Sequence, residues 1–295
     1  MKIQTKFFKL ALYLVLNTLY FTSFAQGYPE TDIYLADISV NKGKYEVKNL
    51  ENITNRPGYD NQPSFFDNNT IYFTSIREKN QSDIYSYNIQ SKETKKIIDT
   101  PESEFSPTLM PSGKSFSSVL IEKDSTQRLW KFSLNGKEPE VIFSEIDSIG
   151  YHTWINDKDL ALFILTNPFS LQITSIGKNS ARIAAKNIGR CLQTVPGKQI
   201  VSFVDKTDSL NWKIKLYDPK FDSMSEITTT LKGSEDYAWT QSGDLILGNK
   251  GKLYKFTPKK DKDWIEIADF SFEITEIQRI SISADGKKIS FVSKK

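Results

Sequence analysis

Short segments of alternating hydrophobic and polar residues recur along the chain after residue 30, and tight turns or polar loops separate them. Residues 70–89 are typical, because TIYFTS and DIYSYNI each alternate with a period of two on either side of a polar loop. Alternation with this period places successive side chains on opposite faces of a β-strand. Tyr, Phe, Ile and Thr dominate these segments, and these residue types favour strands. The pattern therefore predicts an all-β chain of short antiparallel strands.

A large apolar residue opens the strand that follows each tight turn, and it recurs at nearly constant spacing. The six positions are Ile71, Phe116, Leu160, Ile200, Leu245 and Ile289. Their successive spacings are 45, 44, 40, 45 and 44 residues. Most of the preceding turns contain Gly or Asn, which tolerate the backbone angles of short hairpins. A repeat of this length indicates a solenoid or a propeller, and four short strands fit within one repeat.

A second apolar position, in the alternating segment after each polar loop, repeats with a similar period. Its spacings are 45, 42, 43 and 39 residues, and it is occupied by Ile84, Leu129, Leu171, Ile214 and Leu253. The sixth copy is Ile33, in TDIYLADI near the N-terminus, whereas the last repeat holds only RISISADGKKISFVSK at 279–294. An open solenoid would need capping repeats instead. We therefore predict a single domain over 26–295. It is a six-bladed β-propeller of four-stranded antiparallel blades, with its ring closed by N-terminal strands that complete the C-terminal blade.

Two stretches resemble a known repeat. SPTLMPSGKSFSSV at 106–119 and ISISADGKKISFVS at 280–293 look like the pattern S-P-x-Φ-S-x-D-G-K-x-Φ-x-F-x-S, in which Φ is hydrophobic. TSIREKNQSDIYSYNI at 74–89 is similar to its continuation. These motifs resemble the TolB-like, WD-type β-propeller family over residues 60–135 and 279–293, and the stretch between them keeps the spacing but loses the Ser-Pro. The resemblance implies a propeller that acts as a binding scaffold.

The first 25 residues have the three parts of a secretory signal peptide. Three lysines within the first nine residues give a positive start, and residues 10–24 are mostly apolar. The small residues Ser23 and Ala25 occupy positions −3 and −1 of a cleavage site before Gln26. The apolar run is shorter than the ~20 residues that span a membrane. We expect an exported protein, periplasmic, secreted or at the cell surface, with no membrane span in its mature form.

Charge and residue usage exclude several classes of partner and chemistry. The chain has 39 basic and 36 acidic residues, and removal of the signal peptide with its three lysines leaves 36 of each. A balanced chain lacks the basic footprint of a nucleic-acid partner. One histidine and one cysteine cannot build a His-rich or Cys-rich metal site, and nucleotide-binding and G-x-S-x-G motifs are missing. We expect no cofactor and no metal. Carboxylates are abundant, however, so an enzyme that uses Asp or Glu side chains is not excluded.

Bulky or charged residues lie where each repeat begins its first strand. In a four-stranded meander these links lie on the face opposite the tight turns, so ring symmetry would gather them at one mouth of the central channel. The candidate partner-binding residues are Tyr59, Asp60, Phe105, Tyr151, His152, Arg190, Asp236, Tyr237 and Arg279. They form either a recognition surface of exposed side chains or a plug that seals the channel. A plug would leave binding to the polar loops, near Arg77, Asn80, Asp124 and Asp208.

These observations predict an exported, non-catalytic binding scaffold whose partner is a protein segment or a component of the cell envelope. The alternative is an enzyme at the channel mouth, a hydrolase or lyase that acts on a sugar or a lactone. We expect His152 to pack beside Tyr151 and Trp154 rather than to act as a ligand or general base, and Cys191 to be a buried, inert thiol.

The signal-peptide assignment has a direct test. Exported protein is expected to begin at Gln26, because cleavage follows Ala25. Intact-mass measurement of protein purified from outside the cytoplasm checks this, and a mass that retains Met1 would contradict the assignment.

Overall fold

The computed structural model describes residues 27–78 and 80–295. Every regular element within these two ranges is a β-strand, as the alternating pattern predicts. The expected signal peptide, residues 1–25, lies outside the described residues. A search of the described part of the chain finds no helix that is long and apolar enough to cross a membrane.

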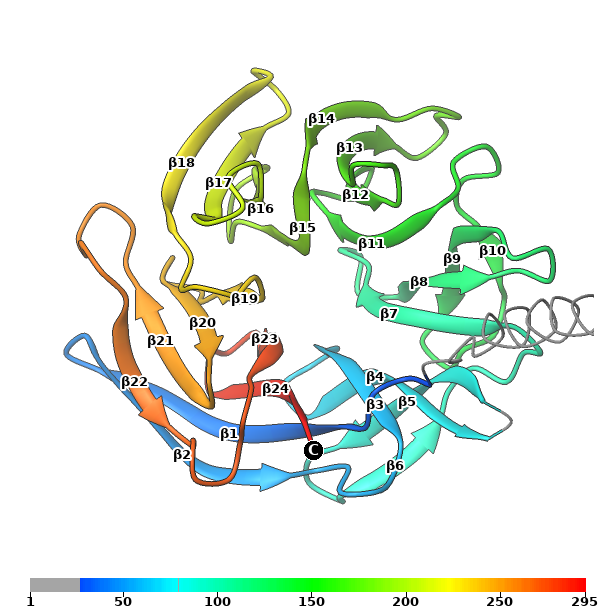
Figure 1. The fold of residues 1–295 in the computed structure, drawn as a ribbon. Coiled ribbons are helices and arrows are strands. Elements are labelled where there is room, and N and C mark those ends of the chain that lie inside the picture. Colours follow the sequence, from blue (N-terminus) through cyan, green and yellow to red (C-terminus); the bar gives the residue numbers. More distant parts are fainter. Residues whose placement is uncertain (1–26, 79) are drawn as a thin grey trace, which may run out of the picture.

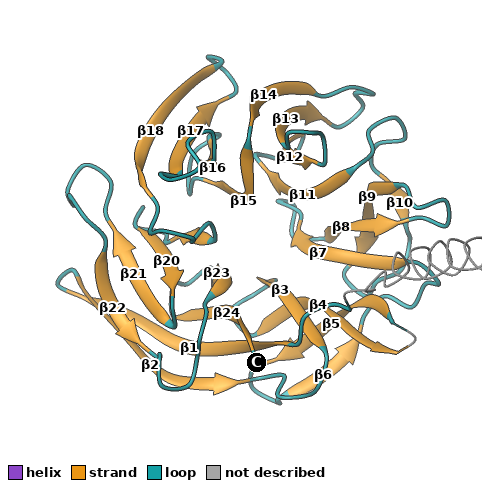
Figure 2. Ribbon diagram, viewed as in Figure 1, coloured by secondary structure: helices purple, strands orange, loops and turns teal. Residues whose placement is uncertain are grey.

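Four separate sheets follow one another along the middle of the chain, and each is an antiparallel meander of four strands. Figures 1 and 2 show the sheets arranged about a common centre. The first two sheets consist of β7 (Ser103–Leu109), β8 (Ser115–Ile121), β9 (Gln127–Ser133) and β10 (Glu140–Val141), and of β11 (Ile149–Trp154), β12 (Asp159–Ile164), β13 (Ser170–Ser175) and β14 (Arg182–Lys186). The next two consist of β15 (Ile188–Thr194), β16 (Val201–Asp205), β17 (Lys213–Asp218) and β18 (Ser223–Thr229), and of β19 (Tyr237–Trp239), β20 (Leu245–Asn249), β21 (Lys252–Phe256) and β22 (Ile265–Asp269).

A fifth sheet of eight strands joins the two ends of the chain. Its strands are β1 (Thr31–Asn41), β2 (Lys44–Asn52), β3 (Tyr59–Phe65), β4 (Thr70–Glu78), β5 (Gln81–Asn88), β6 (Glu93–Lys96), β23 (Gln278–Ile282) and β24 (Lys288–Lys294). It has two antiparallel parts, β23–β24–β1–β2 and β3–β4–β5–β6, which one parallel bridge connects between Thr31 and Tyr59. Strand β1 pairs with β24 from Thr31 opposite Lys294 to Asp37 opposite Lys288. This is the pairing that the split repeat predicts.

The repeated apolar positions lie on the third and second strands of these units. All six third-strand positions, from Ile33 to Leu253, are completely buried. Five of the six second-strand positions are also completely buried, but Ile200 lies one residue before β16 and is only partly buried. Val201 takes the buried place there, so the sequence alignment of that repeat was wrong by one residue. The turn before it is closed by a backbone bond from Val195 N to Ile200 O, as Met110 N to Ser115 O closes the turn before Phe116, which makes Val201 the equivalent of Phe116.

Apolar side chains from neighbouring sheets form the core. Each hydrophobic cluster of the described residues contains residues of two sheets that are consecutive along the chain, or of the two parts of the eight-stranded sheet. For example, Ile246 and Leu253 pack with Ile289 and Phe291. The innermost strands also contact one another in order: β3 with β7, β7 with β11, β11 with β15, β15 with β19, β19 with β23, and β23 with β3. Each sheet is therefore covered on both faces, which the burial of apolar surface favours.

The packing of β1 can be tested at Ile33. This side chain is fully buried in one cluster with Phe73 and Val292. Ile33→Ala is expected to lower the free energy of unfolding by about 2–5 kcal/mol, because it leaves a cavity between two sheet parts. Val40→Ala is the control, since Val40 lies on the same strand but is 52% exposed, and it should change stability by only about 0.5 kcal/mol. Denaturant titration measures both. Equal effects would mean that β1 does not pack as described.

One buried carboxyl lies between two neighbouring sheets. Glu104 on β7 is fully buried. Its Oε1 accepts a hydrogen bond from the Thr100 hydroxyl, and its Oε2 has no protein partner. Burial raises the pKa of Glu104 to about 8; the Thr100 hydrogen bond and Lys96 oppose this rise, whereas the charges of Asp83 and Glu102 add to it. The group therefore holds its proton at neutral pH in the folded protein.

The raised pKa of Glu104 makes stability depend on pH. Between pH 4.5, its ordinary pKa, and about 8, the folded state keeps a proton that the unfolded chain loses. The free energy of unfolding should therefore fall as pH rises through this window. Glu104→Gln removes the titrating group and should flatten this fall by an amount on the order of a few kcal/mol. Denaturant titrations at pH 5, 7 and 9 measure the effect, with Glu145→Gln at an exposed position as the control. An unchanged pH profile in Glu104→Gln would contradict the prediction.

Candidate functional site

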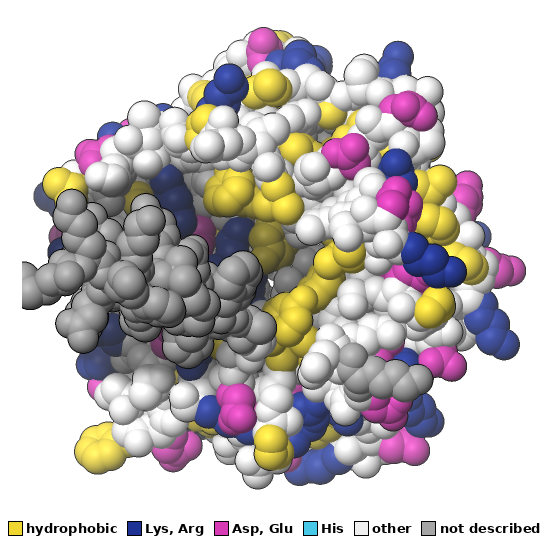
Figure 3. Space-filling view, turned by 45° about the vertical axis from the view of Figure 1, so that its right-hand side comes forward, with side chains coloured by type: hydrophobic (Ala, Val, Ile, Leu, Met, Phe, Trp, Pro, Cys, Tyr) yellow, Lys and Arg dark blue, Asp and Glu magenta, His cyan; other side chains and the backbone are white. Residues whose placement is uncertain are grey.

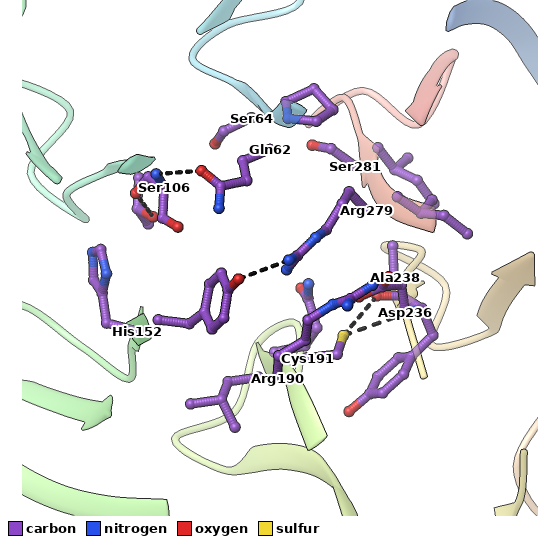
Figure 4. A pocket seen from close by; sticks show the side chains of 18 of the residues that line it. Gln62, Ser64, Ser106, His152, Arg190, Cys191, Asp236, Ala238, Arg279 and Ser281 are labelled. Atoms are coloured by element: carbon purple, nitrogen blue, oxygen red, sulfur yellow. Dashed lines mark hydrogen bonds and ion pairs between the residues drawn. The ribbon is translucent and has the colours of Figure 1, made fainter. Parts of the chain in front are cut away.

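A cavity of about 260 Å³ lies where the innermost strands converge. Residues of β3, β7, β11, β15, β19 and β23 all line it. Figure 3 shows the molecule hollowed at its centre, with hydrophobic side chains along the rim and basic side chains inside. Figure 4 shows the lining side chains from close by.

Backbone irregularities occur in five of the six lining strands, where the pairing register shifts. In three of these strands, one residue of the irregular segment has a left-handed backbone conformation: Gln62, Ser106 and Arg279 have φ angles of 55°, 56° and 54°. A bulge of this kind bends the strand and redirects side chains. Such angles cost an L-residue about 1–3 kcal/mol and persist only where the surroundings impose them. All three side chains line the cavity (Figure 4).

Arg190 has its charge balanced within the cavity wall. Its Nη2 donates to Asp236 Oδ2 at 2.6 Å and to Gln278 Oε1 at 3.0 Å, and Glu235 lies 3.4 Å from Nη1. Burial alone would lower the pKa of Arg190, but the charge and hydrogen bond of Asp236, together with Glu235, raise it overall. Burial alone would raise the pKa of Asp236, but the charges of Arg279 and Arg190 and the Arg190 hydrogen bond lower it. Both groups are therefore ionised.

Arg279 lies across the cavity in a different environment. Its Nη2 donates to the Tyr151 hydroxyl at 2.7 Å, and its guanidinium carbon lies 4.6 Å from the centre of the Tyr151 ring. The ring of Tyr151 in turn packs against Phe163, with centroids 5.5 Å apart. No carboxylate of the described residues forms an ion pair with Arg279, in contrast to Arg190. The wall therefore presents one guanidinium that an aromatic ring positions and that makes no direct ion pair, although its charge lowers the pKa of Asp236.

His152 and Cys191 also line the cavity, and both are buried. His152 Nε2 shares a hydrogen bond of 2.6 Å with the Ser117 hydroxyl, which also accepts from Trp154 Nε1 at 2.9 Å. Burial lowers the pKa of His152 to about 3, and His152 Nδ1 has no protein partner. Burial raises the pKa of the Cys191 thiol to about 12. The imidazole and the thiol are thus neutral at pH 7. The expected burial of Cys191 is confirmed, and His152 and Trp154 share Ser117 as a hydrogen-bond partner.

The structure separates the nine candidate residues into two groups by burial. Phe105, Tyr151, Arg190 and Arg279 are partly exposed, as a recognition surface requires. The other five are buried, which does not fit a recognition surface of exposed side chains: Tyr59, Asp60, His152, Asp236 and Tyr237. Tyr237, for example, donates to Ser202 Oγ at 2.8 Å and packs between two sheets. Both members of the consecutive pairs Tyr59–Asp60 and Asp236–Tyr237 are buried, because neighbouring strands cover both sides of the chain where the inner strands approach one another.

Three of the candidates do not line the cavity: Tyr59, Asp60 and Phe105. The exposed ring of Tyr28 lies 5.2 Å from that of Tyr59 and 6.2 Å from that of Phe105. Asp60 accepts a hydrogen bond of 2.5 Å from Ser75 Oγ and has Arg56 and Arg77 nearby. Burial raises its pKa even though these three partners favour the charged form.

Gln62 and Ser106 are among the cavity residues that the sequence did not mark as candidates. Both precede a proline, and the repeat motif aligns them with Arg279, so this alignment was the available signal. The four residues named for the polar loops do not line the cavity. Within residues 27–78 and 80–295, no group of three or more His, Cys, Asp or Glu side chains is placed to hold a metal ion.

Comparisons with known proteins identify the fold. No protein-family model matches the chain, and no curated protein matches it in sequence. Solved structures do match. A structure assigned to TolB of Agrobacterium tumefaciens has a TM-score of 0.71 at 11% identity, over 90% of this chain and 99% of that one. TolB of Acinetobacter baumannii has a TM-score of 0.57 at 12% identity, over 95% of this chain and 68% of that one.

An oligogalacturonate lyase in complex with manganese is similar as well, with a TM-score of 0.55 at 11% identity, over 85% of this chain and 83% of that one. At these identities the similarity concerns the fold alone, and the same fold carries unrelated functions. The chain is therefore an all-β protein with a TolB-like propeller fold, and its function has to be argued from its own cavity.

Proposed function

We propose that the chain forms a closed ring of six four-stranded blades, in which β23–β24–β1–β2 is the blade shared by both ends of the chain. The cyclic order of contacts among the innermost strands supports closure. So does the packing of Ile33 and Val292 against Phe73, which covers the last interface between blades. In a closed ring no blade has an uncovered apolar face. In open repeat proteins, capping repeats at the two ends cover these faces instead.

We propose further that the protein is exported and acts as a non-catalytic binding scaffold at one mouth of this ring. Its partner is a protein segment or a component of the cell envelope. One observation carries the proposal: Tyr151, Arg190 and Arg279 are partly exposed around a cavity that stays open and polar at its centre. A plug would fill this space with apolar side chains, whereas aromatic and arginine side chains held on rigid strands are typical of binding hot spots.

The titratable groups of the cavity favour binding over catalysis. His152 is neutral over the physiological range and bonded to Ser117, and Asp236 is ionised and bonded to Arg190. A general base works best with a pKa near the working pH and within reach of a substrate proton, and neither group meets both conditions. Export is supported by the N-terminal sequence alone.

An enzyme acting on a sugar or a lactone is the second candidate. The observation that favours it is the fold shared with the oligogalacturonate lyase, together with the polar character of the cavity. Turnover of uronate oligosaccharides or lactones that is lost in Tyr151→Phe would support this candidate and contradict the scaffold. The Phe variant keeps the ring but removes the hydroxyl that Arg279 contacts.

The scaffold proposal is tested by capture of a partner from an envelope extract. Tyr151→Ala should weaken retention of the partner by about 30-fold, since loss of a hot spot costs about 2 kcal/mol or more. Leu210→Ala is the control, because Leu210 is 78% exposed in the loop between β16 and β17, away from the cavity. Quantitative mass spectrometry measures retention, and thermal unfolding of each variant is measured in parallel.

Two outcomes contradict the scaffold proposal. Retention of the same proteins by the wild type and Tyr151→Ala would place binding elsewhere. A large fall in melting temperature of Tyr151→Ala with intact capture would mean that Tyr151 is part of a plug.

A further inference from the structure

We propose that the central cavity is a carboxylate site, in which Arg279, Tyr151 and Gln62 bind one carboxylate group of the ligand. The inference deepens the proposed binding function and rests on it. It assigns the cavity a ligand chemistry, whereas the scaffold proposal concerns only where binding occurs.

The charge of the cavity lining gives the first argument. Its ionised side chains are Arg190, Asp236 and Arg279, since His152 is neutral. Arg190 and Asp236 form a hydrogen-bonded pair, and the charge of Arg279 also lowers the pKa of Asp236. One carboxylate thus faces two guanidiniums, which leaves one excess positive charge in a recessed site, where an incoming anion is favoured. One excess positive charge matches a monoanion.

The hydrogen-bond donors give the second argument. A guanidinium has five N–H donors, and Arg279 makes one side-chain hydrogen bond to the described residues, to the Tyr151 hydroxyl. That hydroxyl accepts from Arg279, so its own proton is free for a ligand. Gln62 uses its amide oxygen to accept from Thr74 Oγ1 and from the backbone of Ser106, both at 2.8 Å. The amide nitrogen of Gln62 therefore remains available as a donor. Figure 4 shows Gln62 and Arg279 pointing into the same space.

The backbone gives the third argument. Gln62 and Arg279 both occupy left-handed positions within bulges of β3 and β23. Strain of this kind is concentrated at binding and catalytic sites, where it orients side chains before the ligand arrives. The planar fork of an arginine fits the two oxygens of a carboxylate. A cavity of about 260 Å³ has room for a carboxylate group and a short stem, but is below the ~300–1,000 Å³ of sites for drug-sized ligands.

A buried, unpaired polar group in the same wall points to a ligand as well. His152 is 7% exposed, lines the cavity, and has no protein partner for Nδ1. The Ser117 hydroxyl accepts from Trp154 and can donate either to the Thr108 carbonyl oxygen at 3.4 Å or to His152 Nε2, so Nδ1 is either an acceptor or a donor. Buried polar atoms normally have partners. A ligand that accepts or donates a hydrogen bond here, directly or through water, would supply one.

The test uses isothermal titration of the full-length mature protein at constant ionic strength. The probes are propionate and two capped peptides, acetyl-Gly-Ser-Glu-Ser-Gly-amide and the same peptide with Gln in place of Glu. Propionate and the Glu peptide should bind saturably, and the Gln peptide at least tenfold more weakly. Arg279→Asn should weaken carboxylate binding at least tenfold. Asn is chosen because it tolerates the left-handed backbone of this position. Arg182→Asn on the outer strand β14 should bind as the wild type does.

Arg279→Lys keeps the positive charge but loses the planar guanidinium, so it should weaken carboxylate binding severalfold. This variant replaces Arg279→Asn in the test if the Asn variant does not fold. A Glu peptide that binds much more tightly than propionate would identify a polypeptide side chain as the source of the carboxylate. Equal affinities would identify a free small acid. The proposal is overturned if neither carboxylate probe binds saturably to the wild type, or if both Arg279 variants bind as well as the wild type.

Failure of this inference differs from failure of the scaffold proposal. Envelope partners retained equally by the wild type and Arg279→Asn, without carboxylate binding, would leave the scaffold in place and overturn the carboxylate site. Carboxylate binding that depends on Arg279, without any captured partner, would support the site and contradict the scaffold.

Discussion

The pairing of β1 with β24 is the interaction on which the rest of the structure depends. It joins residues from opposite ends of the chain, Thr31 to Asp37 with Lys288 to Lys294. Without it, β23 and β24 would form a hairpin with one apolar face uncovered, and Ile33 would lose its place beside Phe73. Contacts between residues so far apart in sequence require a large loss of chain entropy, which only extensive burial offsets. The same pairing brings β23, and with it Arg279, beside β3 and Gln62.

The cavity follows from how the innermost strands approach one another. Strands that run towards a common centre cannot all present large side chains there, and the bulges in β3, β7 and β23 bend the backbone at this point. The charged side chains at this point are the hydrogen-bonded pair Arg190 and Asp236 and the guanidinium of Arg279, which makes no direct ion pair. Because these side chains are already held in place, a ligand that binds them would cause a smaller loss of side-chain entropy.

Burial changes what the buried candidates contribute. Tyr237 and His152 stabilise the cavity walls through hydrogen bonds to Ser202 and Ser117. They hold inner strands against neighbouring sheets and so fix where Tyr151 and Arg190 lie. The buried carboxyl of Glu104 has a similar position between sheets and is neutral at pH 7. Substitution of Tyr237 or Glu104 would alter stability first and binding only through it.

The sequence by itself determined the strand content, the repeat, the pairing of the split unit and the buried third-strand positions such as Ile84 and Leu253. These features depend on local alternation and on a period that is visible along the chain. It also marked Arg190 and Arg279 as candidates, because they occupy equivalent places before inner strands. Only the tertiary structure decided that Arg190 forms an ion pair with Asp236 while Arg279 bonds to Tyr151, and that Tyr237 is buried. Those differences depend on which residues of other sheets lie opposite, and the distances and burial that control charge balance arise only when the strands converge.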